Sequence, residues 1–284
     1  MLKRVAEFLD MIKFQHTVFA LPFALMSAFL AADGVPSRRV LLLVLAAMVT
    51  ARSCAMAFNR IADARLDALN PRTADRAIPA GRIGMPAAWI FMIAMGALFV
   101  VTAWAINRLC FYLSPVALTI VLGYSLTKRF TSLTHLFLGL ALSVAPVGAW
   151  LAVTGAFALP PLMLAAAVLC WVAGFDIIYA CQDVDFDRTT GLHSIPKSVG
   201  IPRALHISTA LHALTIAVLL CMPLVCDLGW LYVGGVIATG VLFAYEHVIV
   251  KPSDLSRVNT AFLTVNGVVS ILLACVAVAD VLLG

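Results

Sequence analysis

The stretch from Val40 to Asp67 reads VLLLVLAAMVTARSCAMAFNRIADARLD. It begins with an apolar run of about the ~20 residues that an α-helix needs to cross a bilayer. Apolar and polar residues do not alternate in it, as they would in the strands of a membrane barrel. The stretch therefore predicts a membrane-spanning helix that continues into a polar segment.

Similar apolar runs fill the rest of the chain. Of its 284 residues, 63% are hydrophobic and 12% are charged, about half of the ~25% charged share of a soluble domain. This composition excludes an ordinary water-soluble enzyme, a disordered chain and a nucleic-acid binder with a basic face. We expect one all-α transmembrane domain over residues 1–284, an integral membrane bundle of nine transmembrane helices at about 14–32, 40–62, 86–106, 110–127, 133–153, 159–181, 204–224, 229–249 and 258–282.

The basic residues predict how this bundle is oriented. Fifteen of the 19 Lys and Arg residues lie before the first run or in every second connection, whereas Arg38, Arg39 and Arg108 lie in the connections of the other side. Cytoplasmic loops of membrane proteins carry an excess of Lys and Arg. The N-terminus is therefore predicted to be cytoplasmic and the C-terminus to lie outside, in the cell inner (plasma) membrane.

A first acidic cluster follows the second apolar run. Asn59, Asp63 and Asp67 are spaced by four residues, so they share one face of a helix. Arg52 precedes Asn59 by seven residues and lies on the same face, inside the apolar run. A charge at that depth costs at least ~2.5 kcal/mol unless it is paired or hydrated, and an anionic group of a substrate would be a suitable partner.

A second acidic cluster occupies the equivalent place after the sixth run. Tyr179, Asp183 and Asp187 again step by four, and Asp176 lies seven residues before Asp183. Equivalent aspartates of the two clusters are 120 residues apart. This spacing favours a parallel internal repeat and predicts that both clusters, in loops of about 59–85 and 176–203, face the cytoplasm.

Two rows of carboxylates repel each other, so they need a counter-charge. Mg²⁺ prefers oxygen ligands and is typically held by carboxylates together with substrate phosphates. The clusters therefore predict a Mg²⁺ site with ligands from Asn59, Asp63, Asp67, Asp176, Asp183 and Asp187. The alternative is a pair of solvated acidic helix ends, which the matched spacing of the clusters disfavours.

Basic residues beside the acids predict a phosphate-binding function. Arg76 follows the first cluster, Lys197 follows the second, and Lys128 and Arg129 lie between the fourth and fifth runs. Carboxylates that hold metal and cations that hold a phosphorylated group together make a diphosphate site. Arg82 and Arg203 are interpreted as charges that only set the orientation of the chain in the membrane. Gln15, His16 and Thr17 lie at the cytoplasmic edge of the first run, where His16 is a weaker candidate for contact with substrate.

The chain resembles the UbiA superfamily of intramembrane aromatic prenyltransferases over essentially its whole length. Asn59, Asp63 and Asp67 resemble the first aspartate motif of that family, and the second acidic cluster resembles its second motif. Tyr124 with Lys128 and Arg129, and the loop from Thr73 to Arg76, are also similar to family motifs. The resemblance implies catalytic roles for Asp63, Asp67, Asp183 and Asp187, and substrate binding by Arg52, Asn59, Arg76, Tyr124, Lys128, Arg129, Tyr179 and Lys197.

Two segments resemble different branches of the family. KFQHTVFALPFA at 13–24 is similar to 4-hydroxybenzoate polyprenyltransferases, whereas SRVNTAFLTVNG at 256–267 is similar to relatives in futalosine-type menaquinone synthesis, which are thought to prenylate 1,4-dihydroxy-6-naphthoate. The resemblance thus implies Mg²⁺-dependent transfer from a polyprenyl diphosphate to an aromatic acid in ubiquinone or menaquinone biosynthesis. Two rival classes are a secondary transporter and a phosphatidyltransferase. The latter normally carries one contiguous Asp-rich motif, and this chain has two separated clusters.

Overall fold

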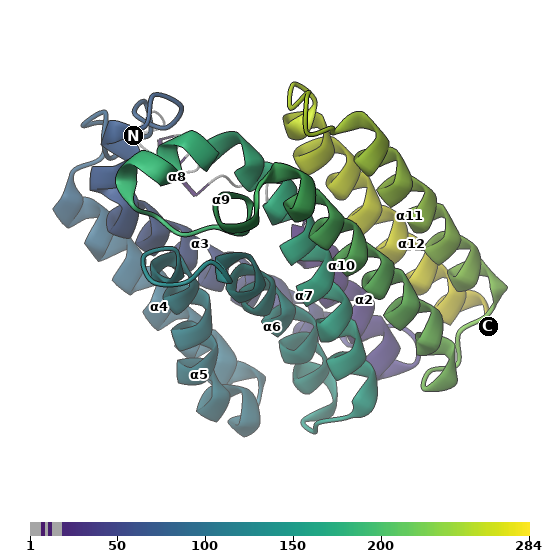
Figure 1. Cartoon of the computed structure of the whole chain (residues 1–284). Helices are drawn as coiled ribbons and strands as arrows, with labels where there is room; N and C mark the ends of the chain where they lie inside the picture. The colour runs from purple at the N-terminus through teal and green to yellow at the C-terminus, as the bar shows by residue number, and fades with distance from the viewer. Residues whose placement is uncertain (1–6, 9–10, 13–18) are drawn as a thin grey trace.

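The computed structural model describes residues 7–8, 11–12 and 19–284, and every regular element in this part of the chain is helical. The long helices run side by side as a bundle, and two short helices lie across one end of it (Figure 1). In chain order the elements are α2 (Leu21–Ala32), α3 (Arg38–Leu69), α4 (Met85–Ile106), α5 (Arg108–Thr127), α6 (Thr134–Thr154), α7 (Leu159–Ala180), η2 (Cys181–Asp183), α8 (Val184–Thr190), α9 (Ile195–Val199), α10 (Ile201–Cys221), η3 (Met222–Leu224), α11 (Trp230–Ile249), η4 (Thr260–Val265) and α12 (Asn266–Leu283).

Eight helical segments of the described part are long and apolar enough to cross a membrane. They match the second to ninth predicted runs. The first predicted run, 14–32, is represented by α2, which has 12 residues. The beginning of the predicted run falls in 13–18, outside the described residues. The predicted all-α membrane architecture is confirmed, while the count of nine stays a prediction.

Helix α3 shows why the first acidic cluster projects from the bundle. The helix starts where the Ser37 hydroxyl accepts a hydrogen bond from the Val40 N–H at 3.3 Å, as expected for a serine N-cap. It runs without interruption for 32 residues. It ends at Asn70, whose backbone is extended, because the following Pro71 disfavours the helical conformation of the residue before it. The predicted run of 40–62 is thus extended at its polar end to Leu69.

The core of the bundle lies around α7. Trp171 and Phe175 of this helix are buried together with Phe23 of α2, Tyr232 of α11 and residues of α12. Helix α6 packs closely on α7 at Gly139, where an added Cβ would collide with the backbone of Leu169. Small residues allow such close approach of membrane helices. Both acidic clusters lie at the end of the bundle where α8 and α9 lie, and the C-terminal end of α12 lies at the opposite end (Figure 1).

Candidate active site

The first acidic cluster is built on one continuous face of α3, as predicted. Asp63 and Asp67 are 2% and 6% exposed, and the Asn59 amide lies 3.4 Å from Asp63 Oδ2. One turn beyond, the Thr73 hydroxyl donates to the backbone carbonyl of Asp67 at 3.0 Å, which folds the following loop back over the cluster. The carboxylates are therefore held in place by the helix and its loop.

The second acidic cluster departs from the predicted helical face. Helix α7 ends at Ala180, a single 3₁₀ turn covers Cys181–Asp183, and α8 begins at Val184. A 3₁₀ turn has three residues per turn, so it shifts the register of the side chains that follow it. Tyr179, Asp183 and Asp187 therefore do not stack on one continuous α-helix, and the expectation that they would was wrong.

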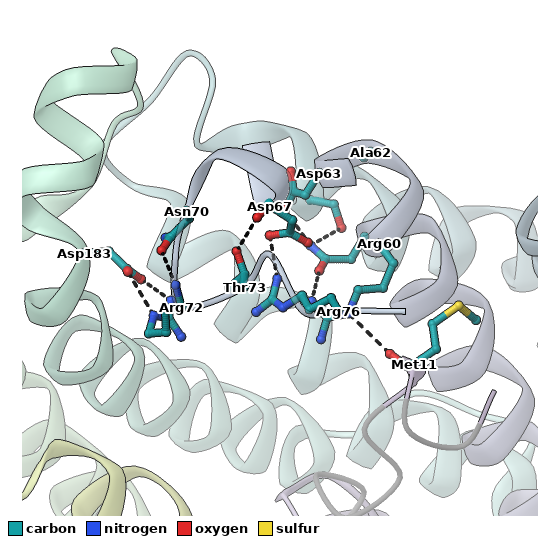
Figure 2. A network of polar contacts seen from close by, with 12 residues as sticks. Met11, Arg60, Ala62, Asp63, Asp67, Asn70, Arg72, Thr73, Arg76 and Asp183 are labelled. Atoms are coloured by element: carbon teal, nitrogen blue, oxygen red, sulfur yellow. Dashed lines mark hydrogen bonds and ion pairs between the residues drawn. The ribbon is translucent and has the colours of Figure 1, made fainter. Parts of the chain in front are cut away.

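Cations pair with the aspartates of the first cluster. Lys128 Nζ lies 2.6 Å from Asp63 Oδ2 and Arg129 Nη2 lies 3.0 Å from Asp63 Oδ1. Arg76 Nη1 lies 2.7 Å from Asp67 Oδ1, and Figure 2 shows its side chain directed at this carboxylate. The predicted neighbours Arg76, Lys128 and Arg129 thus do lie at the acidic cluster.

Arg72 joins the two clusters, a role that the sequence did not reveal. From the loop after α3, its Nε and Nη2 donate to the two oxygens of Asp183 at 3.1 and 2.5 Å, and its Nη1 donates to the Tyr179 hydroxyl at 2.8 Å. Figure 2 shows Arg72 reaching from the first cluster to Asp183. Residues that are 111 positions apart in the sequence are thereby brought into one site.

The environment of Arg72 keeps it charged. Burial acts to lower the pKa of its guanidinium, but the neighbouring Tyr179 hydroxyl and the Asp183 carboxylate raise the pKa above its ordinary value. A planar guanidinium that binds a carboxylate through two nitrogens is also suited to bind phosphate in the same way. Arg72 is therefore a phosphate-binding candidate beside the predicted ones.

His135 is a further residue of the site that the sequence analysis did not single out. Its Nδ1 lies 2.7 Å from Asp176 Oδ2, and its Nε2 accepts a hydrogen bond from the Ile195 N–H at 3.3 Å. Because Nε2 is an acceptor, the Nδ1 nitrogen carries the proton and donates it to Asp176. A polar residue near the start of an apolar run was the available signal, but its partner depends on how α6 packs against α7.

A cavity of about 790 Å³ extends from the acidic end into the bundle. Its charged end is lined by Asp63, Asp67, Arg72, Arg76, Lys128, Asp176, Asp183 and Asp187. Farther from the clusters the lining is apolar and includes Val116, Leu140, Phe157 and Leu162. The cavity can therefore accept a molecule with a strongly anionic head and a long apolar tail.

Arg52 and Tyr124 line the same cavity, as Asn59 and Tyr179 do. The Nε of Arg52 is buried and has no hydrogen-bond partner among the described residues, and the same is true of Asp67 Oδ2. Unsatisfied buried polar atoms are rare and call for a partner. Both atoms belong to residues that line the cavity, so a bound ligand would satisfy them.

Lys197 differs from the expectation that it contacts phosphate. Its ammonium donates to the backbone carbonyls of Leu192 and Asp187 at 2.6 and 3.1 Å, and it is not among the described residues that line the cavity. The Asp187 carboxylate accepts instead from the Ser194 hydroxyl at 2.7 Å. Lys197 thus holds the loop that carries this contact. Gln15, His16 and Thr17 lie outside the described residues.

The acidic side chains of the site are the candidate ligands of a Mg²⁺ ion. Within residues 7–8, 11–12 and 19–284, no three His, Cys, Asp or Glu side chains converge closely enough to hold one metal ion, because the aspartates point at their cationic partners. The available donors are nevertheless carboxylate and amide oxygens, which suit Mg²⁺, and Asp67 Oδ2 is free to take a ligand. The donor chemistry of the site therefore fits Mg²⁺.

Comparison with known proteins decides the family. Residues 20–275 match the model of the UbiA prenyltransferase family. The chain belongs to this family. It is therefore a prenyltransferase, and the eight long apolar helices within the described residues indicate a multi-pass membrane protein. Membership of the UbiA family favours the enzyme over the secondary transporter that the sequence had left open.

Relatives in the UbiA family extend over nearly the whole chain. A 4-hydroxybenzoate octaprenyltransferase of Tolumonas auensis is 32% identical over 263 residues, covering 88% of this chain and 89% of that protein. One from Shewanella piezotolerans is 30% identical over 245 residues, covering 85% and 84%. The apo structure of a UbiA homolog from Aeropyrum pernix K1 has 35% identity and a TM-score of 0.85, covering 94% of this chain and 98% of that one.

A more distant solved structure shares the fold. The UbiA homolog from Archaeoglobus fulgidus bound to GPP and Mg²⁺ is 22% identical, with a TM-score of 0.72, covering 97% of this chain and 99% of that one. The shared fold agrees with the family resemblance, which the family model and the relative from Tolumonas auensis confirm.

Proposed function

We propose that this UbiA family member transfers a polyprenyl group from its diphosphate to an electron-rich aromatic acid of the 4-hydroxybenzoate or 1,4-dihydroxy-6-naphthoate type, with Mg²⁺, in ubiquinone or menaquinone biosynthesis. The observation that carries the proposal is the cavity itself. Two acidic clusters with interleaved cations lie at one end of it, and the remainder is apolar. A prenyl diphosphate has the same division into an anionic head and an apolar tail.

The relatives support 4-hydroxybenzoate as acceptor, a prenyl diphosphate as donor and the use of Mg²⁺. Those from Tolumonas and Shewanella are named for 4-hydroxybenzoate as acceptor, and the Archaeoglobus homolog was solved with a prenyl diphosphate and Mg²⁺. We further propose that residues 1–284 act as one transmembrane domain in the bacterial inner membrane. Its N-terminus is then cytoplasmic, its C-terminus lies outside, and the loops of about 59–85 and 176–203 face the cytoplasm.

We infer that binding of the diphosphate exchanges the ion pairs of the site. Arg72, Arg76 and Lys128 release their carboxylates and donate to phosphate oxygens. Asn59, Asp63 and Asp67 of the first cluster, with Asp176, Asp183 and Asp187 of the second, would supply the oxygen ligands for Mg²⁺. The ion supplies the positive charge that stabilises the diphosphate leaving group. Lys197 keeps its hydrogen bonds to the backbone of the second loop, and Arg129 keeps its ion pair with Asp63.

The chain's own residues make the reaction selective. The cations of the site stabilise the negative charge that develops on the leaving diphosphate, which is electrostatic catalysis. The apolar lining keeps water away from the prenyl group. Arg52, whose Nε lacks a partner, binds the acceptor carboxylate beside Tyr124 and orients the ring. The proton that the ring loses passes to Asp67, whose Oδ2 lacks a hydrogen-bond partner, or to Asp187, and the carboxylate that accepts it would do so in place of binding the metal.

The proposal is tested by incubating membranes that contain the chain with Mg²⁺, a labelled polyprenyl diphosphate and each acceptor acid separately. We expect label on one aromatic acid, and none when Mg²⁺ is chelated. The matched control is the Asp63→Ala variant in the same membranes. Label on neither acid, with the protein folded and inserted, would contradict the proposal.

A further inference from the structure

A buried polar network lies behind one wall of the cavity. It joins Trp171 of α7, Glu246 of α11 and Asn266 of α12, each of which is 0% exposed. The Trp171 indole N–H donates to Asn266 Oδ1 at 2.6 Å, and Asn266 Nδ2 donates to Glu246 Oε1 at 2.8 Å. None of these three side chains lines the cavity, so the network takes no direct part in substrate binding.

The network is expensive for a membrane helix bundle. Ionisable residues inside membrane spans are costly and usually mark function. The second carboxylate oxygen of Glu246 has no hydrogen-bond partner among the described residues and lies 3.8 Å from His212 Nδ1. Apolar residues of similar size often serve the fold as well as, or better than, buried polar groups. The stability of the fold therefore does not explain why these side chains are polar. A role in fixing one particular backbone conformation does explain it.

The conformation that Asn266 fixes is a π-helical turn. Thr260–Val265 forms six residues of π-helix directly before α12, a feature frequently found at functional sites. The backbone N–H of Asn266 bonds to the Ala261 carbonyl, and its side-chain amide donates to the same carbonyl at 2.9 Å. One residue thus fastens the turn and ties it to α7 and α11.

This π-helical turn carries Phe262 into the wall of the cavity. The Phe262 ring lies 4.3 Å from the Tyr179 ring and 5.4 Å from the rings of Phe175 and Phe19, measured between centroids. These four residues, Phe19, Phe175, Tyr179 and Phe262, line the cavity and are called the aromatic wall below. At the charged end of the wall, the Tyr179 hydroxyl accepts a hydrogen bond from Arg72 at 2.8 Å.

Resting on the proposed function, we propose that Asn266 and Glu246 are positioning residues that hold the π-helical turn, so that Phe262 completes an aromatic wall against the positive charge that develops on the prenyl group. Aromatic rings attract cations within about 6 Å of their centroids, most strongly where water is excluded. The wall begins at Tyr179, beside the residues assigned to the diphosphate. It therefore lies where the prenyl carbon nearest the leaving group would be.

The test compares two ligands of the full chain that differ only in charge. One is a trialkylammonium analogue of the prenyl cation and the other is its neutral hydrocarbon isostere, each bound in the presence of inorganic diphosphate and Mg²⁺. We expect the unaltered protein to prefer the cationic analogue by about fivefold or more. Phe262→Leu should abolish this preference, whereas Phe157→Leu, at an apolar part of the cavity, should retain it.

The positioning role is tested by variants that leave the cavity lining unchanged. Asn266→Leu should lose the preference as Phe262→Leu does, and Glu246→Gln should keep it, because the amide oxygen still accepts from Asn266. If Asn266→Leu fails to fold, the double variant Glu246→Leu with Asn266→Leu removes both partners of their hydrogen bond, which is better tolerated, and should lose the preference too.

The outcomes separate this inference from the proposed function. A preference that survives in Phe262→Leu overturns the aromatic wall. A preference that survives in the Asn266 variants overturns the positioning network alone. An unaltered protein that transfers prenyl groups but shows no preference for the cationic analogue overturns the wall and leaves the proposed function standing. Absence of any transfer to an aromatic acid overturns both.

Discussion

The two acidic clusters have the same spacing in the sequence but are built differently. The first lies on the unbroken helix α3, where Asp63 is 2% exposed and Asp67 is 6% exposed. The second is divided by a 3₁₀ turn, and the Asp183 side chain is 22% exposed. Equal spacing of carboxylates therefore does not imply equal local structure. The first cluster is buried on one helix, whereas the second spans a helix break and leaves Asp183 partly exposed.

The origin of the cationic partners also differs. The first cluster is neutralised by Lys128 and Arg129 from the end of α5 and by Arg76 from its own loop. Asp183 of the second cluster is neutralised by Arg72, which belongs to the loop of the first. The second half of the site is thus held in place by the first, and changes in the first should be felt in both.

The largest effect is expected at Asp63 of the first cluster. Asp63→Ala removes the carboxylate that pairs with Lys128 and Arg129, so kcat/KM for prenyl transfer should fall by about 10³-fold, the scale of losing a main electrostatic contact in a catalytic site. The rate of product formation in detergent measures it. Asp75→Ala, at a carboxylate that is 96% exposed, is the matched control. Comparable activity of both variants would contradict the assignment.

A smaller effect is expected from breaking the link between the clusters. Arg72→Ala removes a guanidinium with three hydrogen bonds to Asp183 and Tyr179, and should raise KM for the prenyl diphosphate by about tenfold to a hundredfold. Arg72→Lys should restore only part of this, because Lys cannot bind in the same bidentate manner. Arg82→Ala, which loses an exposed pair with Asp75, should leave KM unchanged. An unchanged KM in Arg72→Ala would show that the clusters act separately.

A more selective effect is expected for Arg52, which lies deeper in the bundle than both acidic clusters. Arg52→Ala should raise KM for the aromatic acid by about tenfold, the scale of one charge-assisted hydrogen bond, and leave KM for the prenyl diphosphate unchanged. Steady-state kinetics with each substrate varied in turn separates the two. If instead the prenyl diphosphate KM rose alone, Arg52 would belong to the diphosphate site.

The smallest effect is expected within the second cluster itself. The Asp185 side chain is 97% exposed and pairs at 3.4 Å with Arg188, so Asp185→Ala should change kcat/KM by less than about twofold, since exposed ion pairs contribute little. Its neighbour Asp187 is buried and accepts from Ser194. Asp187→Ala should reduce kcat/KM in the same assay far more than Asp185→Ala. Equal losses of kcat/KM in the two variants would contradict the expectation that Asp187, but not Asp185, belongs to the site.

Much of the fold could be predicted because its determinants are local. Continuous apolar runs predicted the eight long spans, and the absence of Gly and Pro from 38–69 allowed α3 to carry Asn59, Asp63 and Asp67 on one face. The break at Cys181–Asp183 had no comparable signal, because no Gly or Pro marks it. It accompanies a contact between Asp183 and Arg72, 111 residues earlier.

The candidate site was predicted in its charges and less well in its pairings. The aspartates and Arg52, Arg76 and Lys128 do meet at one cavity, because their residue types are rare in an apolar chain and therefore informative. The pairs His135–Asp176 and Arg72–Asp183, and the carbonyl contacts of Lys197, depend on how separate helices and loops pack. Spacing along the sequence carries no information on such contacts.

The central claim is that the two clusters form one site for a single diphosphate. It is tested most directly by a double-mutant cycle on Mg²⁺-dependent binding of inorganic diphosphate to the full chain, with Asp63→Ala, Asp183→Ala and the two combined. We predict that each single variant loses most of the binding and that the combined variant loses little more, as for residues that act as a unit. Losses that simply add would show two independent sites and contradict the claim.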